Sequence, residues 1–537
     1  MDKTSVLNEN APLPGLHECI EFLVGYTKPS ERVDLTIVSL LEKTIIAEKN
    51  GDYGYDLSDD DLYTVKKFFN NNDGLFKASV GLNEPFALCG STLMTHRMKK
   101  AIEDINTVLT DKACKSGFEI LSKHDNLSPE QNNAVKNALE NRISIITGGP
   151  GTGKTSVIAQ IVQTFVEITG NTESIAVCAP TGKAANRVGE VLFRYPDIKP
   201  QTVHRLCGYS PSGGYYLHNS ENRLAYDLVI VDESSMLDLY TARQLAVSLK
   251  TDCILVLVGD AFQLPPVGSG RFFNDIVDFS DKHQVPISKL TKNFRSEGVS
   301  LGHFVEKCRT GDFSPDDTFK DVHFEQVMIE KFTQITDYKI NPIWTRPVAI
   351  PDDLKLKDPI FLDEWKKLNS QIILTPVNSG PMGTEEINKR IFVKYGDFFA
   401  GMRIIMNKNN YTWNIFNGDM GIIIPGIYQT NETLWAAFPE NDYFRTIPVS
   451  EISTSISGAH AVTVHRSQGS EFNEVILLLP PNAANLTPQL IYTAVSRARK
   501  KVTVYGDINQ FSAILKVRQK RKTSLFSFSN NSKDDLL

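Results

Sequence analysis

The residues from Gly148 to Thr155 have the types and spacing needed to bind a chain of phosphates. They read Gly-Gly-Pro-Gly-Thr-Gly-Lys-Thr and fit the pattern G-x-x-x-x-G-K-[ST] in full. Lys154 is suited to neutralising the β- and γ-phosphates, and the hydroxyl of Thr155 to ligating Mg²⁺. Backbone N–H groups can curve around phosphates where the loop residues are small. Here these residues are Gly148, Gly149, Gly151, Thr152 and Gly153.

An acidic pair, Asp232-Glu233, follows the apolar run Leu228–Val231. The carboxyl end of a strand is where ligands bind in parallel sheets. We expect Asp232 to hold Mg²⁺ through water and Glu233 to orient and polarise an attacking water. No Asn/Thr-Lys-x-Asp motif for guanine is present, which favours ATP over GTP. Gln131, upstream of the loop, is a candidate for pairing with adenine, because an amide matches the N6 and N7 edge.

These groups need a sheet to position them, and the sequence pattern provides one. From about residue 127, short β-branched runs alternate with helical stretches, at Ser144–Thr147, Ser174–Ala179, Leu228–Val231 and Ile254–Gly259. This alternation predicts an α/β fold, with a parallel sheet and helices on both faces. A second set of strands, at Ile372–Thr375, Val475–Leu479 and Lys501–Tyr505, predicts a second α/β domain.

Two regions differ from these domains in amino-acid composition and apolar spacing. Residues 1–125 include helical apolar spacing, as at 33–48, and predict a mainly helical N-terminal domain. Residues 395–455 are rich in Gly, Asn and aromatics, which favours short antiparallel strands and a small β-barrel insertion. The remaining boundaries place a first α/β domain at 126–289, a second at 290–394 and 456–515, and a disordered tail at 516–537.

Composition narrows the class of protein. Hydrophobic content of 41% and charged content of 22% are typical of soluble globular proteins. No apolar run approaches the ~18 residues of a membrane span, and the N-terminus lacks a secretion signal. The seven cysteines form no Cys-x-x-Cys pair, which argues against a zinc or iron–sulfur site and suits a reducing cytoplasm. The net charge of −6 counts mildly against DNA as a partner, although strand tracking needs only a local basic groove.

Seven motifs occur in an order that resembles superfamily 1 helicases. They are Ala179–Ala185, Thr202–Leu206, Asp232–Met236, Gly259–Pro265, Leu290–Ser296, Thr463–Glu471 and Tyr492–Arg499. The resemblance covers about 127–507. It implies two RecA-like P-loop motor domains that close on ATP and pull on a DNA strand.

The resemblance also implies roles for particular residues. Arg295 and Arg497 would bring charge from the second domain onto the departing γ-phosphate, as arginine fingers do. Gln263 would sense the γ-phosphate and report it to the DNA groove. Gly469 and Glu471 would lie near the ribose.

Short polar or cationic side chains in the same motifs suit hydrogen bonds to DNA phosphates. They are Thr181, Lys183, Thr202, His204, Thr463 and His465. Either histidine could instead be a packing residue. Phe262 and Tyr492 could stack on bases or lie in the core, and the sequence does not rank these two outcomes.

Three stretches narrow the resemblance to RecD-type helicases: Ile373–Asn388, Phe416–Gly421 and Tyr492–Asp507. In exodeoxyribonuclease V, RecD is the α subunit and works beside the RecB and RecC chains. The resemblance implies 5′→3′ translocation on single-stranded DNA in the repair of double-strand breaks by recombination. It also implies an SH3-like insertion in the second motor lobe.

The N-terminal region bears on whether the chain works in a complex. Pro85–Met98, a strand, turn and strand followed by a helix, resembles the end of the RecD domain that contacts RecC. No helix-hairpin-helix repeats are present, which favours a subunit over a longer stand-alone relative. A stand-alone or phage-encoded helicase stays open, as does a subunit with a vestigial motor. Residues 186–226 are few, so any strand-separating pin among them must be small. Residues 310–370 match no motif that can be named.

Overall fold

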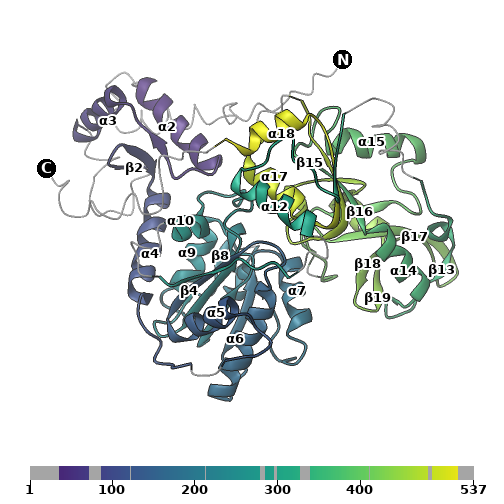
Figure 1. Ribbon diagram of the computed structural model, residues 1–537, viewed down its shortest axis with the longest axis horizontal. Coiled ribbons are helices and arrows are strands. Elements are labelled where there is room, and N and C mark those ends of the chain that lie inside the picture. Colours follow the sequence, from purple (N-terminus) through teal and green to yellow (C-terminus); the bar gives the residue numbers. More distant parts are fainter. Residues whose placement is uncertain are drawn as a thin grey trace.

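The computed structural model describes residues 35–71, 86–120, 123–211, 213–278, 285–294, 299–326, 339–410, 412–481 and 486–517. Figure 1 shows four parts. We call them the N-terminal part (35–120), lobe 1 (123–294), lobe 2 (299–326, 369–395 and 459–517) and the insertion sheet (339–368 and 396–458). In the described residues, no helix combines the length and apolarity that crossing a membrane requires.

The N-terminal part combines helices with a small antiparallel sheet of order β1-β3-β2. Its elements are α2 (Leu35–Lys49), β1 (Tyr55–Asp56), α3 (Asp59–Asn71), β2 (Phe86–Cys89), β3 (Thr92–Thr95) and α4 (His96–Lys112). The predicted strand, turn, strand and helix over 85–98 are therefore confirmed. Apolar residues of α2 and the sheet, including Ile37, Leu41 and Leu93, form its own core.

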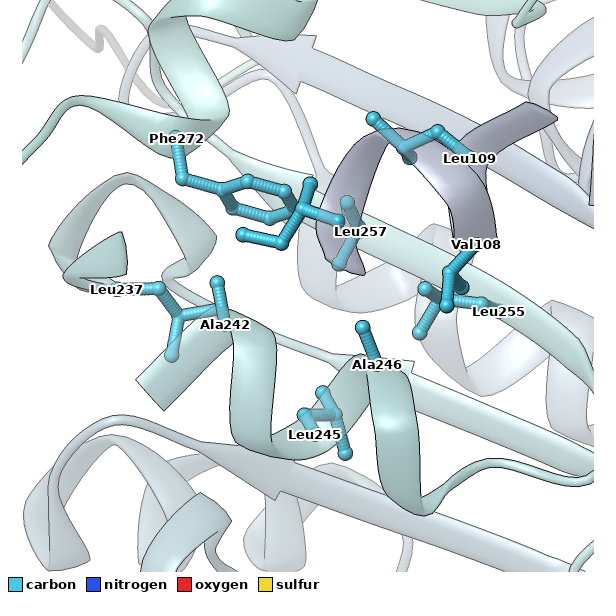
Figure 2. A pocket seen from close by; sticks show the side chains of 10 residues that line it. Val108, Leu109, Leu237, Ala242, Leu245, Ala246, Leu255, Leu257 and Phe272 are labelled. Carbon is cyan, nitrogen blue, oxygen red and sulfur yellow. The ribbon is translucent and has the colours of Figure 1, made fainter. Parts of the chain in front are cut away.

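Helix α4 fixes the N-terminal part to lobe 1. Figure 2 shows Val108 and Leu109 of α4 facing Ala246 of the lobe 1 helix α9 (Leu239–Ser248) and Leu255 and Leu257 of the strand beneath it. At the end of α4, the Lys112 ammonium donates to the carbonyl oxygens of Lys250, Thr251 and Cys253. Because the contact combines apolar packing with a satisfied buried cation, the two parts form a continuous unit.

Lobe 1 is a six-stranded parallel sheet of order β11-β4-β10-β9-β5-β6. Its strands are β4 (Ile143–Gly148), β5 (Ile175–Ala179), β6 (Gln201–Thr202), β9 (Leu228–Val231), β10 (Ile254–Gly259) and β11 (Ile287–Leu290). The central strands are continuously apolar because helices cover both faces. All four strands predicted here are confirmed, and Leu290, where the sequence placed the second domain, ends β11.

The helices of lobe 1 carry the motifs at the carboxyl ends of these strands. They are α5 (Pro129–Glu140), α6 (Lys154–Thr169), α7 (Gly182–Val191), α8 (Val203–Leu206), η1 (Ser234–Met236), α9 and α10 (Phe272–Asp278). A small hairpin, β7 (Tyr209–Ser210) and β8 (Tyr215–Tyr216), projects after α8.

Lobe 2 is a second parallel sheet, of order β12-β23-β22-β15-β21. Its strands are β12 (Val322–Glu325), β15 (Gln371–Thr375), β21 (Ala461–Thr463), β22 (Phe472–Leu478) and β23 (Ala498–Tyr505). Its helices are α12 (Val299–Thr310), α15 (Thr384–Tyr395), η4 (His465–Ser467), α17 (Pro488–Val495) and α18 (Ile508–Leu515). Helix α14 (Pro359–Leu368) lies against the insertion sheet instead (Figure 1), where Phe361 packs on Trp344 and Trp365 on Phe444. The predicted second α/β domain is confirmed. Of the predicted tail, 518–537 lie outside the described residues.

The insertion sheet contains the antiparallel strands expected over 395–455. These are β16 (Arg403–Met406), β17 (Met420–Tyr428), β18 (Asn431–Glu440), β19 (Tyr443–Pro448) and β20 (Ile456–Gly458), with α16 (Val449–Ile452) and η3 (Ser453–Ser455). Residues 339–358 add η2 (Pro342–Thr345), β13 (Val348–Ala349) and β14 (Lys355–Leu356) to it. The strand order runs from β14 to β20 without pairing these two edges, so the pairing does not show closure into an SH3-like barrel.

Candidate functional site

The phosphate loop lies between β4 and α6, and its glycines are required by its geometry. Gly151 and Gly153 have φ angles of 77° and 82°, in the left-handed region that favours glycine. A Cβ on Gly148 would lie 2.6 Å from the hydroxyl of Thr152, and one on Gly149 would lie 3.1 Å from that of Tyr492. The loop is therefore a tight cradle at the N-terminus of α6, the kind of site that binds anions.

Lys154 begins α6 and closes the loop from inside. Its ammonium donates to the carbonyl oxygens of Gly148, at 2.7 Å, and Gly149, at 3.0 Å. Thr155, the predicted Mg²⁺ ligand, is half-buried beside it. The cation thus satisfies the loop carbonyls in this state and would exchange them for phosphate oxygens when a nucleotide binds.

Gln131 packs directly against the loop. Its amide nitrogen donates to the carbonyl oxygen of Thr152, at 3.1 Å, and its amide oxygen accepts from the backbone of Ser128 in a capping box. A Cβ on Gly153 would lie 2.3 Å from the Gln131 nitrogen. The structure therefore brings Gln131 to the nucleotide site, while the pairing with adenine stays a prediction.

The acidic pair follows β9 and faces the same cleft. Glu233 has a left-handed backbone, with φ of 50°, and such strain in a non-glycine residue is typical of functional sites. Its Oε2 is buried without a hydrogen-bond partner among the described residues. Burial and the neighbouring Glu233 raise the pKa of Asp232 to about 7, while Lys154 and Arg187 oppose the rise. Two buried carboxylates of this kind fit a site for a cation.

The motif that contains Gln263 centres on the buried carboxylate of Asp260. One oxygen, Oδ2, accepts from the phenol of Tyr492, at 2.9 Å, and from the amide of Gln263, at 3.3 Å. Burial raises the pKa of Asp260, and Lys154 is the largest opposing influence. Gln263 Oε1 is buried and has no partner among the described residues.

Of the two alternatives left open for the aromatic residues, the structure places Tyr492 in the core. Its side chain is 2% exposed. Burial and Asp260 raise the pKa of Tyr492 well above its ordinary value, so the phenol stays a donor. Phe262 is 44% exposed and lies beneath the guanidinium of Arg309, 4.5 Å from the ring centre.

The two predicted arginine fingers have different outcomes. Arg497 is buried and donates to the carbonyl oxygens of Thr493, at 3.1 Å, and Ser470, at 3.4 Å, so it is held within lobe 2. Arg295 lies outside the described residues, and its role stays a prediction. The described Phe294 donates its backbone N–H to the carbonyl oxygen of Gly151, at 2.8 Å, which joins the Leu290–Ser296 motif to the phosphate loop.

Glu471 joins lobe 2 to lobe 1 through Arg187, which the sequence did not single out, and also pairs with Arg499 of its own lobe. One oxygen accepts from Arg187 of α7, at 2.6 Å, and the other accepts from Arg499, at 2.9 Å. Nearby Glu471, Glu233 and Asp232 raise the pKa of Arg187 against the opposing effect of burial. Arg187 lies one helical turn after the DNA candidate Lys183, and this spacing is the feature of the sequence that could have pointed to Arg187. Gly469 adopts φ of 73°, and the ribose contact of either residue stays a prediction.

The three threonines predicted to contact DNA all cap helical turns. The hydroxyl of Thr181 accepts from the N–H of Ala184, that of Thr202 from Arg205, and that of Thr463 from Arg466. These bonds, of 3.2–3.4 Å, explain the residue type through N-capping. A contact with a DNA phosphate stays a prediction for each.

The remaining DNA candidates are partly buried. His204 packs against Tyr209 and Tyr216 of the hairpin, with ring centres 5.6 and 6.1 Å apart. Burial lowers the pKa values of His465 and Lys183, and Asp419 partly opposes the change at Lys183.

The insertion sheet also touches lobe 1 beside Lys183. A Cβ on Gly182 would lie 2.2 Å from the ring of Phe416, which is buried. Gly182 therefore lets this ring approach the start of α7 closely.

The two parallel sheets, the phosphate loop and the opposed motifs define an ATP-dependent DNA helicase of superfamily 1. Residues 131–269 match an AAA domain family, and residues 458–505 match the UvrD-like helicase C-terminal domain. The chain is 30% identical to the RecBCD enzyme subunit RecD of Mycolicibacterium smegmatis over 74% of each protein. It therefore belongs to the RecD family.

The chain is also similar to two other named helicases. The chain is 29% identical to the ATP-dependent RecD2 DNA helicase of Deinococcus radiodurans, over 74% of this chain and 52% of that protein. Among solved structures, the Pif1 helicase from Candida albicans aligns with a TM-score of 0.42 and 19% identity, over 75% of this chain and 98% of that one.

Proposed function

We propose that this protein is an ATP- and Mg²⁺-dependent motor that moves 5′→3′ along single-stranded DNA. The observation that carries the proposal is the meeting of both lobes at the phosphate loop. The lobe 2 residue Tyr492 lies against Gly149 and donates to Asp260. A change in phosphate occupancy at the loop would therefore alter contacts between the lobes, and such domain movement is how hydrolysis drives stepping.

The residues that would hold Mg²⁺ are Thr155 and Asp232, since hydroxyl and carboxylate oxygens are the ligands this ion takes. When bound, the ion supplies charge that offsets the phosphate oxygens. Glu233, with its unpartnered oxygen, is suited to orienting the attacking water. Lys154 stabilises charge at the phosphates. We assign the same role to Arg497 of lobe 2 and to Arg295, which lies outside the described residues.

We further propose that the small hairpin β7–β8 separates the DNA strands. Tyr209 and Tyr215 are 39% and 60% exposed on it, and Leu217 just beyond is 57% exposed. His204, a DNA candidate, packs at its base. Exposed aromatic side chains beside a strand-binding segment are suited to stacking on an opened base.

The test of the motor is Lys154→Ala in the full-length protein. This substitution should abolish DNA-stimulated ATP hydrolysis and the unwinding of 5′-tailed duplex DNA. Lys136→Ala is the matched control, because Lys136 is a half-exposed lysine of lobe 1 that pairs with Glu140, away from the phosphate loop. Its activity should equal that of the wild type. Unwinding of 3′-tailed duplex alone would refute the proposed polarity.

We propose that the chain works with RecB- and RecC-like partners in double-strand break repair, through its N-terminal part. Leu35 of α2 and Tyr63 of α3 expose 62% and 71% of their surfaces there. Full-length protein should co-purify with RecC-like chains, and Tyr63→Ser should reduce the recovery. The alternative is a helicase without partners, and the chain is also similar to an ATP-dependent RecD2 DNA helicase. Full processive activity that RecB and RecC leave unchanged would favour that alternative.

A further inference from the structure

Three hydrogen bonds connect lobe 2 to the segment of lobe 1 that carries Gln263. The phenol of Tyr492 donates to Asp260, at 2.9 Å. The N–H of Leu264 donates to the hydroxyl of Thr493, at 2.9 Å, and the amide of Gln468 donates to the Leu264 carbonyl, at 3.4 Å. The first of these bonds differs from the others because it ends on a buried carboxylate.

Tyr492 and Gln263 donate to the same oxygen atom of Asp260. Asp260 Oδ2 receives both the phenol of Tyr492 and the amide nitrogen of Gln263. Gln263 Oε1 is buried and has no partner among the described residues, so this amide is held through its nitrogen alone. The phenol oxygen also lies where a Cβ on Gly149 would be only 3.1 Å away. One carboxylate oxygen thus links a lobe 2 side chain at the phosphate loop to the predicted sensor.

We propose that Tyr492 is a positioning residue for ATP hydrolysis: its phenol fixes Asp260, and Asp260 fixes the amide of Gln263 beside the phosphate loop. This inference rests on the proposed ATP-driven motor. Because Tyr492 belongs to lobe 2 and Gln263 to lobe 1, the support that the phenol gives to Asp260 is present only while the lobes are together. Hydrolysis is thereby favoured in the closed arrangement.

Packing alone does not explain why residue 492 is a tyrosine and carries a hydroxyl group. A phenylalanine ring would fill the same buried volume, and Phe262 contacts the ring edge-on with centres 6.3 Å apart. Without the phenol, Asp260 keeps the backbone N–H of Phe262 as a donor, at 3.0 Å. The two bonds at Leu264 would still join the lobes. Removal of the hydroxyl should therefore disturb the placement of Gln263 more than the association of the lobes.

Tyr492→Phe tests this role in the full-length protein with single-stranded DNA present. The kcat for ATP hydrolysis should fall about tenfold, as expected for loss of a hydrogen bond to a charged group, with the KM for ATP within about twofold. The loop residues that bind ground-state phosphates are unchanged, which is why KM should hold.

Tyr53→Phe is the matched control. Tyr53 is equally buried, and its phenol donates to the buried Asp275 at 2.6 Å, across the contact between the N-terminal part and lobe 1. Tyr53→Phe should lower the melting temperature to a similar extent and leave kcat and KM unchanged.

Two results would overturn the role of Tyr492. One is a Tyr492→Phe enzyme with wild-type kcat, and the other is an equal loss of kcat in Tyr53→Phe, which would indicate general destabilisation. Failure of the proposed motor itself would be recognised separately, by an absence of ATP hydrolysis in the wild type.

Discussion

Gly182→Ala should weaken the contact between lobe 1 and the insertion sheet. The added Cβ would lie 2.2 Å from Cγ of Phe416 and 2.6 and 2.7 Å from its Cδ atoms. The ring cannot easily retreat, because Phe416 is 6% exposed and its N–H is bonded to Asp419 at 2.7 Å. Overpacking of this kind costs about 1–3 kcal/mol, and alanine in place of glycine in a helix returns up to about 1 kcal/mol. A net loss of up to about 3 kcal/mol follows.

The assay is calorimetric unfolding of four proteins that form a double-mutant cycle. Phe416→Ala alone should cost about 3–5 kcal/mol, because it empties a buried aromatic site. In that background the obstruction is gone, so Gly182→Ala should become neutral or stabilising by up to about 1 kcal/mol. The change of sign is the decisive result. Equal destabilisation by Gly182→Ala in both backgrounds would refute the steric explanation.

Three further predictions concern Glu48 in the N-terminal part, the ion pair between the two lobes and the hairpin β7–β8. Burial raises the pKa of Glu48 from 4.5 to about 7, although the backbone N–H and the hydroxyl of Thr95 donate to this carboxylate and oppose the rise. Between these two pH values the unfolded chain holds fewer protons than the folded one, so the free energy of unfolding should fall by about 3 kcal/mol as pH rises. Glu48→Gln should flatten the dependence of the melting temperature on pH. A variant with the same slope as the wild type would contradict this. Arg187→Ala removes a partly buried ion pair with Glu471 and should lower the melting temperature by about 2–4 °C, while an unchanged transition would show that the pair adds nothing. Tyr215→Ala should slow unwinding more than ATP hydrolysis in paired assays, and equal losses would exclude a wedge role for the hairpin.

Strands with strong local patterns could be predicted from sequence. Leu228–Val231 and Ile254–Gly259 are β9 and β10 to the residue, because a buried central strand of a parallel sheet needs a continuous apolar run. The two-residue strands β13 and β14 have no such pattern, since their position depends on pairing with β17 and β19. Residues 310–370 therefore gave no prediction that could be named.

The same contrast between local patterns and long-range contacts applies to the residues of the functional site. The phosphate loop and acidic pair are local patterns, and the structure brings both to one cleft. The burial of Tyr492 could not be ranked, because it depends on Asp260, far away in sequence. The ion pair of Arg187 with Glu471 likewise spans the two lobes. For Thr181, Thr202 and Thr463, the structure adds a capping role that the helicase resemblance did not reveal.

The insertion sheet is built from two separate stretches of the chain. β13 and β14 precede β15, whereas β16 to β20 lie between α15 and β21, so the chain enters the sheet twice and leaves it twice. Excision of 396–458 alone would strip β13 and β14 of their partners and expose unpaired strand edges, which promote aggregation. A chimera that exchanges this sheet with a relative must therefore exchange both stretches together. Four covalent connections to lobe 2 also oppose rotation of the sheet about any single hinge.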